Sequence, residues 1–181
     1  MKKVIMIAIA VILAMPMVAQ QKNTATKNKE QAAANDPQKE TRGLEKVYNE
    51  HLNPMHQIDK ALEEARSTNR LVICQVGGNW CPWCLKFANF IATNDDIAQF
   101  VKDHFVYIHV NTSKEHKNPE MLQRLKNPGR FGYPVLVVLN KEGKVIHIQN
   151  SAYLEEGKSY NHDKVLAFFK NWTIEAIETI K

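Results

Sequence analysis

Two cysteines separated by two residues, Cys81 and Cys84, have the residue type and spacing best suited to chemistry in this sequence. They lie in the stretch GNWCPWCL, with Trp80 before the pair and Pro82 and Trp83 inside it. A pair with this spacing can be a redox couple, half of a metal site, or two buried apolar side chains. The elements around the pair decide among these three.

The pair is expected at the first turn of a helix. Residues 71–76 predict a buried strand that ends in a Gly-Gly turn, and residues 81–93 have helical apolar spacing. Unpaired N–H groups and a partial positive charge at a helix start lower the pKa of a thiol below about 8.5. Because only a thiolate attacks a disulfide, Cys81 is predicted to be the exposed nucleophile and Cys84 the shielded resolving cysteine. Pro82 suits a first turn, where its missing N–H is not needed.

The rest of the chain predicts a small α/β domain. Apolar spacing predicts helices at 57–66, 94–101, 119–126 and from about 163 onward, and strands at 105–110, 134–139 and 144–149. The order is α-β-α-β-α-β-β-α. Strands separated by helices should be parallel, and the last two, joined by the turn NKEG, antiparallel. This predicts a mixed sheet of four strands, or five, with helices on both faces.

With these elements in place, the sequence resembles the thioredoxin superfamily, in particular a secreted thioredoxin-like subgroup with a WCxxC motif. The residues that carry the resemblance are Trp80-Cys81-Pro82-Trp83-Cys84 after one strand and Gly132-Tyr133-Pro134 before another. WCxxC alone is a moderate signal, and the later Gly-Tyr-Pro strengthens it. The resemblance covers residues 44–181. It implies a thioredoxin fold, a redox-active Cys81–Cys84 disulfide and no cofactor.

The resemblance also implies a substrate-binding surface. Pro134 is expected to be cis and to face the cysteine pair, and the backbone of Tyr133 to pair with an extended substrate segment. Trp80, Pro82 and Trp83 would complete this surface. The residues alone also allow an ordinary proline at the start of a strand and a Trp80 packed in the core.

Two positions depart from the family pattern. Many thioredoxins have a buried acid six residues before the first cysteine, which helps to deprotonate the resolving cysteine. Here that position is Gln75, which cannot take a proton, so activation of Cys84 would rely on water or another group. Trp83 stands where a histidine would make the pair strongly oxidising. We therefore expect a pair less oxidising than that of the dedicated disulfide-forming oxidases.

The first 19 residues are typical of a Sec signal peptide, with a basic start, an apolar run and a small residue, Ala19, at the expected cleavage point. The apolar run is short for a bilayer span of about 20 residues, which disfavours an uncleaved anchor. Residues 20–43, rich in Gln, Asn, Lys and Ala, predict a flexible linker before the domain at 44–181. We expect a periplasmic or secreted protein that meets the membrane only through its signal peptide during export.

Charge and composition disfavour other functions. The formal net charge is +5, but residues 44–181 hold 17 Lys and Arg against 16 Asp and Glu, so the excess lies in the N-terminal tail. No basic stripe with aromatic residues predicts nucleic-acid binding. No metal site is predicted, because a second CxxC is missing and the seven histidines are scattered. Cys74 lies within a strand and is expected to be an inert buried thiol, with a regulatory or intermolecular disulfide as the alternative.

The sequence therefore predicts an exported thiol–disulfide oxidoreductase that exchanges disulfides with proteins and favours reduction. Its expected partners are the thiols and disulfides of exported proteins and a membrane thiol reductant as electron donor. The alternative is a thioredoxin-fold binding or folding-helper module with little turnover, which the glutamine at position 75 motivates.

Overall fold

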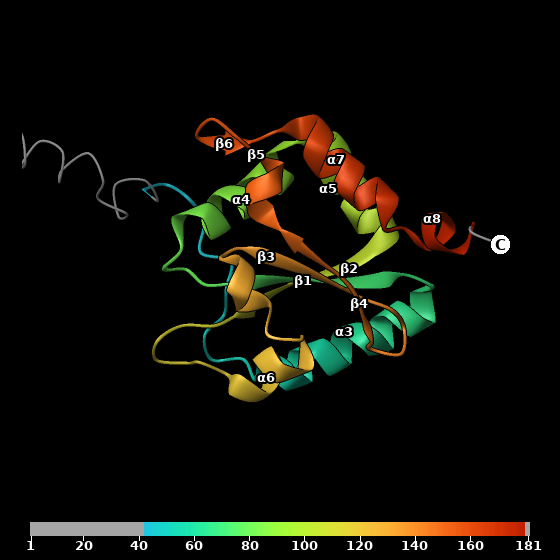
Figure 1. Cartoon of the computed structure of the whole chain (residues 1–181), viewed down its shortest axis with the longest axis horizontal. Helices are drawn as coiled ribbons and strands as arrows, with labels where there is room; N and C mark the ends of the chain where they lie inside the picture. The colour runs from blue at the N-terminus through green and yellow to red at the C-terminus, as the bar shows by residue number, and fades with distance from the viewer. Residues whose placement is uncertain (1–41, 180–181) are drawn as a thin grey trace, which may run out of the picture. The chain divides into compact units, whose positions relative to one another are not determined.

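The computed structural model describes residues 42–179 (Figure 1). The predicted signal peptide, and the predicted linker up to residue 41, lie outside the described residues. The elements are α3 (Pro54–Thr68), β1 (Leu71–Gly77), α4 (Pro82–Thr93), α5 (Asp95–His104), β2 (Phe105–Asn111), α6 (Pro119–Arg124), β3 (Val135–Leu139), β4 (Val145–Asn150), β5 (Glu155–Glu156), β6 (Ser159–Tyr160), α7 (His162–Asn171) and α8 (Ile174–Glu178). Short 3-10 turns lie at Pro128–Phe131 and Ser151–Leu154. Within the described part of the chain, no helix is both long and apolar enough to cross a membrane.

The main sheet has four strands in the order β2-β1-β3-β4, which confirms the predicted mixed sheet. β1 and β2 are parallel, as expected, and β3 and β4 are antiparallel. The described strands β5 and β6 form a separate two-stranded sheet and do not extend the main one.

The direction of β3 differs from the prediction, which had it parallel to β1 because helices separate the two strands. β3 is antiparallel to β1. The helix before it, α6, has six residues, or about 9 Å, and does not reach along a strand of roughly 17 Å. The chain therefore enters β3 at the edge where β1 ends. This places Pro134, which immediately precedes β3, near the cysteine pair.

Helices cover both faces of the sheet: α4, α5 and α7 lie on one side and α3 and α6 on the other (Figure 1). All seven residues of β1 are buried, as expected for a strand between two helical layers. Leu71 and Ile73 pack into the layer of α4, α5 and α7, whereas Val72, Cys74 and Val76 pack toward α3 and α6. The alternation places Gln75 on the same side of the sheet as α4, where the cysteine pair lies.

Two helix boundaries differ from the sequence expectation because side chains cap them. Asn53 accepts hydrogen bonds from the amides of Met55 and His56, at 2.9 and 3.2 Å, so α3 begins at Pro54 instead of residue 57. At the C-terminus, Thr173 accepts from the amide of Ala176 and starts a new helix. The predicted final helix is therefore two helices, α7 and α8.

Candidate active site

The two cysteines lie where β1 ends and α4 begins, as predicted. Cys81 is the N-cap of α4, and Pro82 is its first residue. Their sulfur atoms form a disulfide, with the two Cα atoms 5.2 Å apart. This is the pairing that the family resemblance implied, while the separate roles of nucleophile and resolving cysteine stay predictions.

The helix start is arranged to stabilise charge on the first sulfur. The amide of Cys84 donates a hydrogen bond to Cys81 Sγ at 3.2 Å, so this sulfur caps α4 in the way that a serine or aspartate oxygen would. When the pair is reduced, the same amide and the positive end of the helix dipole favour the thiolate over the thiol. This arrangement supports the predicted role of Cys81 as the attacking sulfur.

Burial of the pair corrects one expectation. Cys81 was expected to be exposed, yet only 5% of its surface is accessible, and Cys84 has none. Cys81 is the more accessible of the two, but Val47, Trp83 and Tyr133 pack against the cluster that contains both cysteines. Cys81 therefore presents little accessible surface in the oxidised protein.

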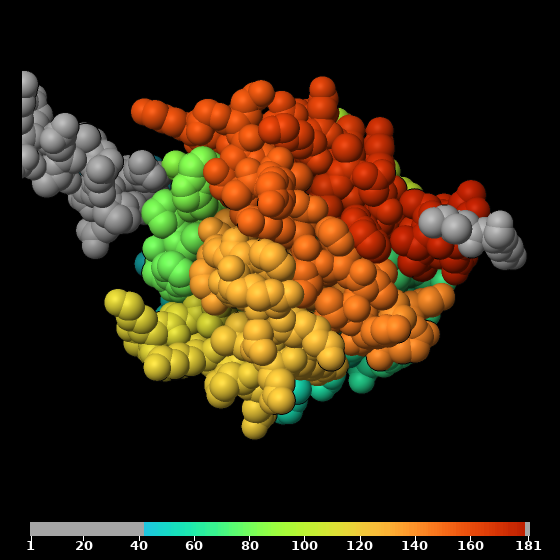
Figure 2. Space-filling model, in the orientation of Figure 1, coloured from blue at the N-terminus to red at the C-terminus, as the bar shows by residue number. Residues whose placement is uncertain are grey.

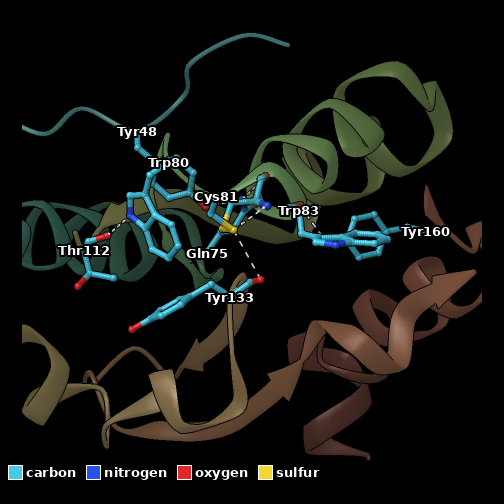
Figure 3. The surroundings of a disulfide bond; sticks show 9 residues. Tyr48, Gln75, Trp80, Cys81, Trp83, Thr112, Tyr133 and Tyr160 are labelled. Carbon is cyan, nitrogen blue, oxygen red and sulfur yellow. Dashed lines mark hydrogen bonds between the residues drawn. A yellow bond between two sulfur atoms is a disulfide. The ribbon is translucent and has the colours of Figure 1, made fainter. Parts of the chain in front are cut away.

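The peptide bond between Tyr133 and Pro134 is cis, as the resemblance implied. Pro134 is buried, and the carbonyl oxygen of Tyr133 lies 3.6 Å from Cys81 Sγ (Figure 3). In the disulfide this is a contact, because the sulfur carries no proton; a reduced Cys81 thiol can donate to the same oxygen. The segment before β3 therefore contacts Cys81 directly.

Trp80 forms part of the surface beside the pair and does not belong to the core, since 52% of it is exposed. Its Nε1 donates to the carbonyl oxygen of Thr112 at 2.7 Å, and its ring meets that of Tyr133 edge to face at 5.6 Å. An open cavity of about 610 Å³ lies alongside, lined by Trp80, Tyr133, Leu122 and residues of the 112–117 loop. Figure 2 shows the green segment of the pair above the yellow 112–117 loop at the left edge.

Trp83 lies on the other side of the disulfide from Trp80 (Figure 3). Its ring meets Tyr160 edge to face at 5.5 Å, and Lys86 Nζ lies 4.7 Å from its centre. Its carbonyl oxygen accepts a hydrogen bond from the Tyr160 hydroxyl at 3.1 Å. The structure therefore does not bring Trp83 to the side of Trp80 and Tyr133, and its predicted role in substrate binding stays a prediction.

Gln75 occupies the centre of a buried polar network. Its Nε2 donates to the hydroxyl of Tyr48 at 2.6 Å and to the carbonyl oxygen of Cys84 at 3.0 Å, and its Oε1 accepts from the hydroxyl of Tyr107 at 2.6 Å. Burial raises the pKa of both tyrosines, so both hydroxyls keep their protons at neutral pH. The sequence offered no signal for Tyr48, which precedes the first predicted element.

The third cysteine, Cys74, is a free thiol on the opposite face of β1 from Gln75. It is fully buried, and burial raises its pKa to about 12. A protonated, inaccessible thiol is inert, as expected for Cys74. Within residues 42–179, no three or more His, Cys, Asp or Glu side chains gather in a way that could hold a metal ion.

Comparison of the sequence with models of known protein families identifies the family of this chain. The model of a family named for thioredoxin-like DsbH, and described as "Protein of unknown function, DUF255", matches residues 38–176. The chain belongs to this DsbH family. It is thereby a member of the thioredoxin superfamily, as the motifs at 80–84 and 132–134 predicted.

Individual relatives of this DsbH-family chain agree with its fold. A disulfide bond reductase DsbH from Chlamydia pneumoniae is 28% identical over 92 residues, which cover 47% of this chain and 55% of the relative. The chain thus matches about half the length of that relative. The solved structure of a disulphide isomerase from Xylella fastidiosa Temecula1 is 25% identical with a TM-score of 0.63, covering 71% of this chain and 98% of that one. This likeness confirms the predicted thioredoxin fold.

Proposed function

We propose that this protein is an exported thiol–disulfide oxidoreductase that reduces disulfides in other exported proteins through Cys81 and Cys84. The observation that carries the proposal is the Cys81–Cys84 disulfide at the start of α4, beside the cis Tyr133–Pro134 bond. The name of the Chlamydia relative, a disulfide bond reductase, and that of the Xylella neighbour, a disulphide isomerase, support the same class of chemistry.

The reaction transfers two electrons in two exchanges. The Cys81 thiolate attacks one sulfur of the substrate disulfide, forms a mixed disulfide and releases the other substrate sulfur as a thiolate. The Cys84 thiolate then attacks Cys81 Sγ, which closes the Cys81–Cys84 disulfide and releases the second substrate sulfur. The substrate thiolates take up protons from water, and an external dithiol must reduce the protein again.

Export and an electron donor complete the proposal. The predicted signal peptide would deliver the protein to the periplasm or beyond, where disulfides persist. A thiol reductant embedded in the membrane would return electrons to Cys81–Cys84. N-terminal sequencing of protein recovered from the periplasm tests the export step. A chain that begins at Gln20 agrees with cleavage after Ala19, and an unprocessed chain would contradict it.

Reduction of insulin by dithiothreitol tests the activity. We expect the wild type to accelerate insulin precipitation and the Cys81→Ser variant to fall to the uncatalysed rate, because it lacks the attacking sulfur. Cys74→Ala is the matched control: it also removes one thiol, but from the far face of β1, and should keep wild-type activity.

The alternative function is a binding or folding-helper module with little turnover. The observation that favours it is Gln75, which stands fully buried beside Cys84 and cannot accept the proton of that thiol. Wild-type protein no faster than dithiothreitol alone would support the module and contradict the reductase.

Trapping identifies the substrates. In Cys84→Ala the mixed disulfide on Cys81 cannot be resolved and should accumulate with exported proteins in a periplasmic extract. The variant that lacks both Cys81 and Cys84 is the control for non-specific adducts. Equal capture by the two variants would contradict a nucleophilic Cys81.

A further inference from the structure

We propose that the Tyr48 hydroxyl donates a hydrogen bond to the sulfur of Cys84 when the pair is reduced, and so stabilises the resolving thiolate. The inference rests on the proposed function and deepens it. It assigns a task to a residue from the segment before α3, where the sequence showed no motif.

The backbone of Tyr48 is tied to the turn that carries the cysteines. Asn79, two residues before Cys81, accepts a hydrogen bond from the Tyr48 amide at 3.1 Å and donates one to its carbonyl oxygen at 2.7 Å. Tyr48 is only 4% exposed and packs in one cluster with Cys81 and Cys84. Figure 3 shows it reaching the site behind Trp80. The position of the ring is therefore fixed relative to the pair.

Gly77 shows how closely the two atoms converge. A Cβ atom at this position would lie 2.5 Å from Cys84 Sγ and 3.0 Å from the hydroxyl oxygen of Tyr48. Both atoms therefore approach the same point above the backbone of β1, with no side chain of residue 77 between them. The hydroxyl oxygen and the sulfur therefore lie within 5.5 Å of each other, the sum of 2.5 and 3.0 Å, and the proposed hydrogen bond forms between them when the pair is reduced.

The hydrogen bonds of Gln75 leave the proton of Tyr48 available. The carbonyl oxygen of Cys84 can only accept, so the amide group that faces it must be the Nε2 of Gln75. The same Nε2 donates to the Tyr48 hydroxyl, which therefore acts as an acceptor in that contact. The proton of the Tyr48 hydroxyl therefore does not point at Gln75, and the sulfur of a reduced Cys84 can accept it.

Tyr48 acts as a donor and not as a base. Burial raises its pKa, so it keeps its proton throughout the pH range in which thiols titrate. The neighbouring His109 ring, centred 5.3 Å away, stays neutral because burial lowers its pKa to about 4. Tyr107 also keeps its proton. The charged and titratable groups of residues 44–52, other than Tyr48 itself, are exposed, namely Glu45, Lys46, Glu50 and His51.

A hydrogen bond of this kind would offset part of the cost of a buried anion at Cys84. Water or the leaving substrate sulfur would still take the proton. The resolving thiolate would form at a lower pH than in the same site without the hydroxyl, which speeds the second exchange. Tyr48 would thus compensate in part for the acid that Gln75 replaces.

Titration of the reduced protein, with cysteine labelled with carbon-13 at Cβ, tests the inference without an activity assay. We expect Tyr48→Phe to raise the pKa of Cys84 by about one unit, the shift that loss of a hydrogen bond to a charged group produces. The matched control is Tyr107→Phe, which removes a hydroxyl from the same glutamine and should leave the titration of Cys84 unchanged. Cys74 serves as an internal reference that does not titrate below about pH 10.

An unchanged pKa of Cys84 in a folded Tyr48→Phe protein would overturn the inference. If that variant does not fold, a fluorinated tyrosine at position 48 keeps the shape and makes the hydroxyl a stronger donor. The pKa of Cys84 should then fall, and a constant value would overturn the inference equally. If the pKa of Cys84 shifts in Tyr48→Phe but the wild type does not reduce insulin, the proposed function fails and this inference stands. If the wild type reduces insulin but the pKa of Cys84 does not shift, this inference fails and the proposed function stands.

Discussion

At the residue scale, Gly77 leaves the space that the cysteine pair needs. An alanine there would place its Cβ 2.5 Å from Cys84 Sγ, which is enclosed and cannot move aside. We expect Gly77→Ala to lower the free energy of unfolding of the oxidised protein by about 1–3 kcal/mol, measured by urea denaturation. Gly129→Ala is the control, because its Cβ would meet the hydroxyl end of the half-buried Tyr133 side chain and not a fully enclosed atom. Equal stability of the two variants would contradict this account.

Also at the residue scale, His109 links stability to pH. Its Nε2 is enclosed without a hydrogen-bond partner among the described residues, and burial lowers its pKa from 6.5 to about 4. The unfolded chain therefore binds the proton more readily, so the stability from a neutral His109 is complete above about pH 6.5 and is lost as the pH falls toward 4.

Between pH 7.5 and pH 5, His109 should account for about 2 kcal/mol of the fall in the free energy of unfolding. Urea denaturation at the two pH values should show this fall in the wild type and a smaller one in His109→Gln. The exposed His56 provides the control, since His56→Gln should keep the wild-type difference. The same pH dependence in all three proteins would show that His109 is not the group responsible.

At the element scale, the segment before α3 depends on one side chain from the turn before α4. Asn79→Ala removes both hydrogen bonds that hold the backbone of Tyr48. We expect faster hydrogen exchange at residues 44–52, measured by mass spectrometry, with α3 unaffected because Asn53 caps it independently. Asn89→Ala, on the exposed side of α4, is the control. Unchanged exchange in Asn79→Ala would mean that apolar packing alone holds the segment.

At the scale of the whole molecule, the redox state of the pair and the stability of the fold are linked. A strong oxidant is one whose reduced form is the more stable. The described donor to Cys81 Sγ is the Cys84 amide, and the Trp83 ring, which packs on Tyr160, donates no described hydrogen bond to that sulfur. We therefore expect the oxidised protein to have the higher free energy of unfolding.

Urea denaturation of both redox forms, in the Cys74→Ala background that lacks the third thiol, measures this difference. Equilibration with glutathione then gives the reduction potential, which should lie well below the roughly −120 mV of the strongest oxidases. A more stable reduced form, or a potential near that value, would indicate an oxidase and would contradict the proposed direction of the reaction.

Much of the fold could be predicted because its signals are local. The apolar run of β1, the glycines after it and the spacing of α4 together place Cys81 at a helix start, since strand period, turn and cap each depend on a few neighbouring residues. The motif at 132–134 likewise pointed to the cis bond, although only through resemblance to a family.

Only the tertiary structure revealed the features that depend on contacts between residues far apart in the sequence, namely strand direction, burial and side-chain contacts. The antiparallel direction of β3 follows from a connection whose helix is too short to reach along a strand, and no residue within β3 signals it. The burial of Cys81, the contact of Trp83 with Tyr160 and the approach of Tyr48 to Cys84 each join segments separated by 30 or more positions in the chain. The sequence pointed to the two sulfur atoms that pair, through its resemblance to the thioredoxin superfamily. Only packing across the sheet edge decided what surrounds them, because burial and hydrogen-bond partners are properties of neighbours in space.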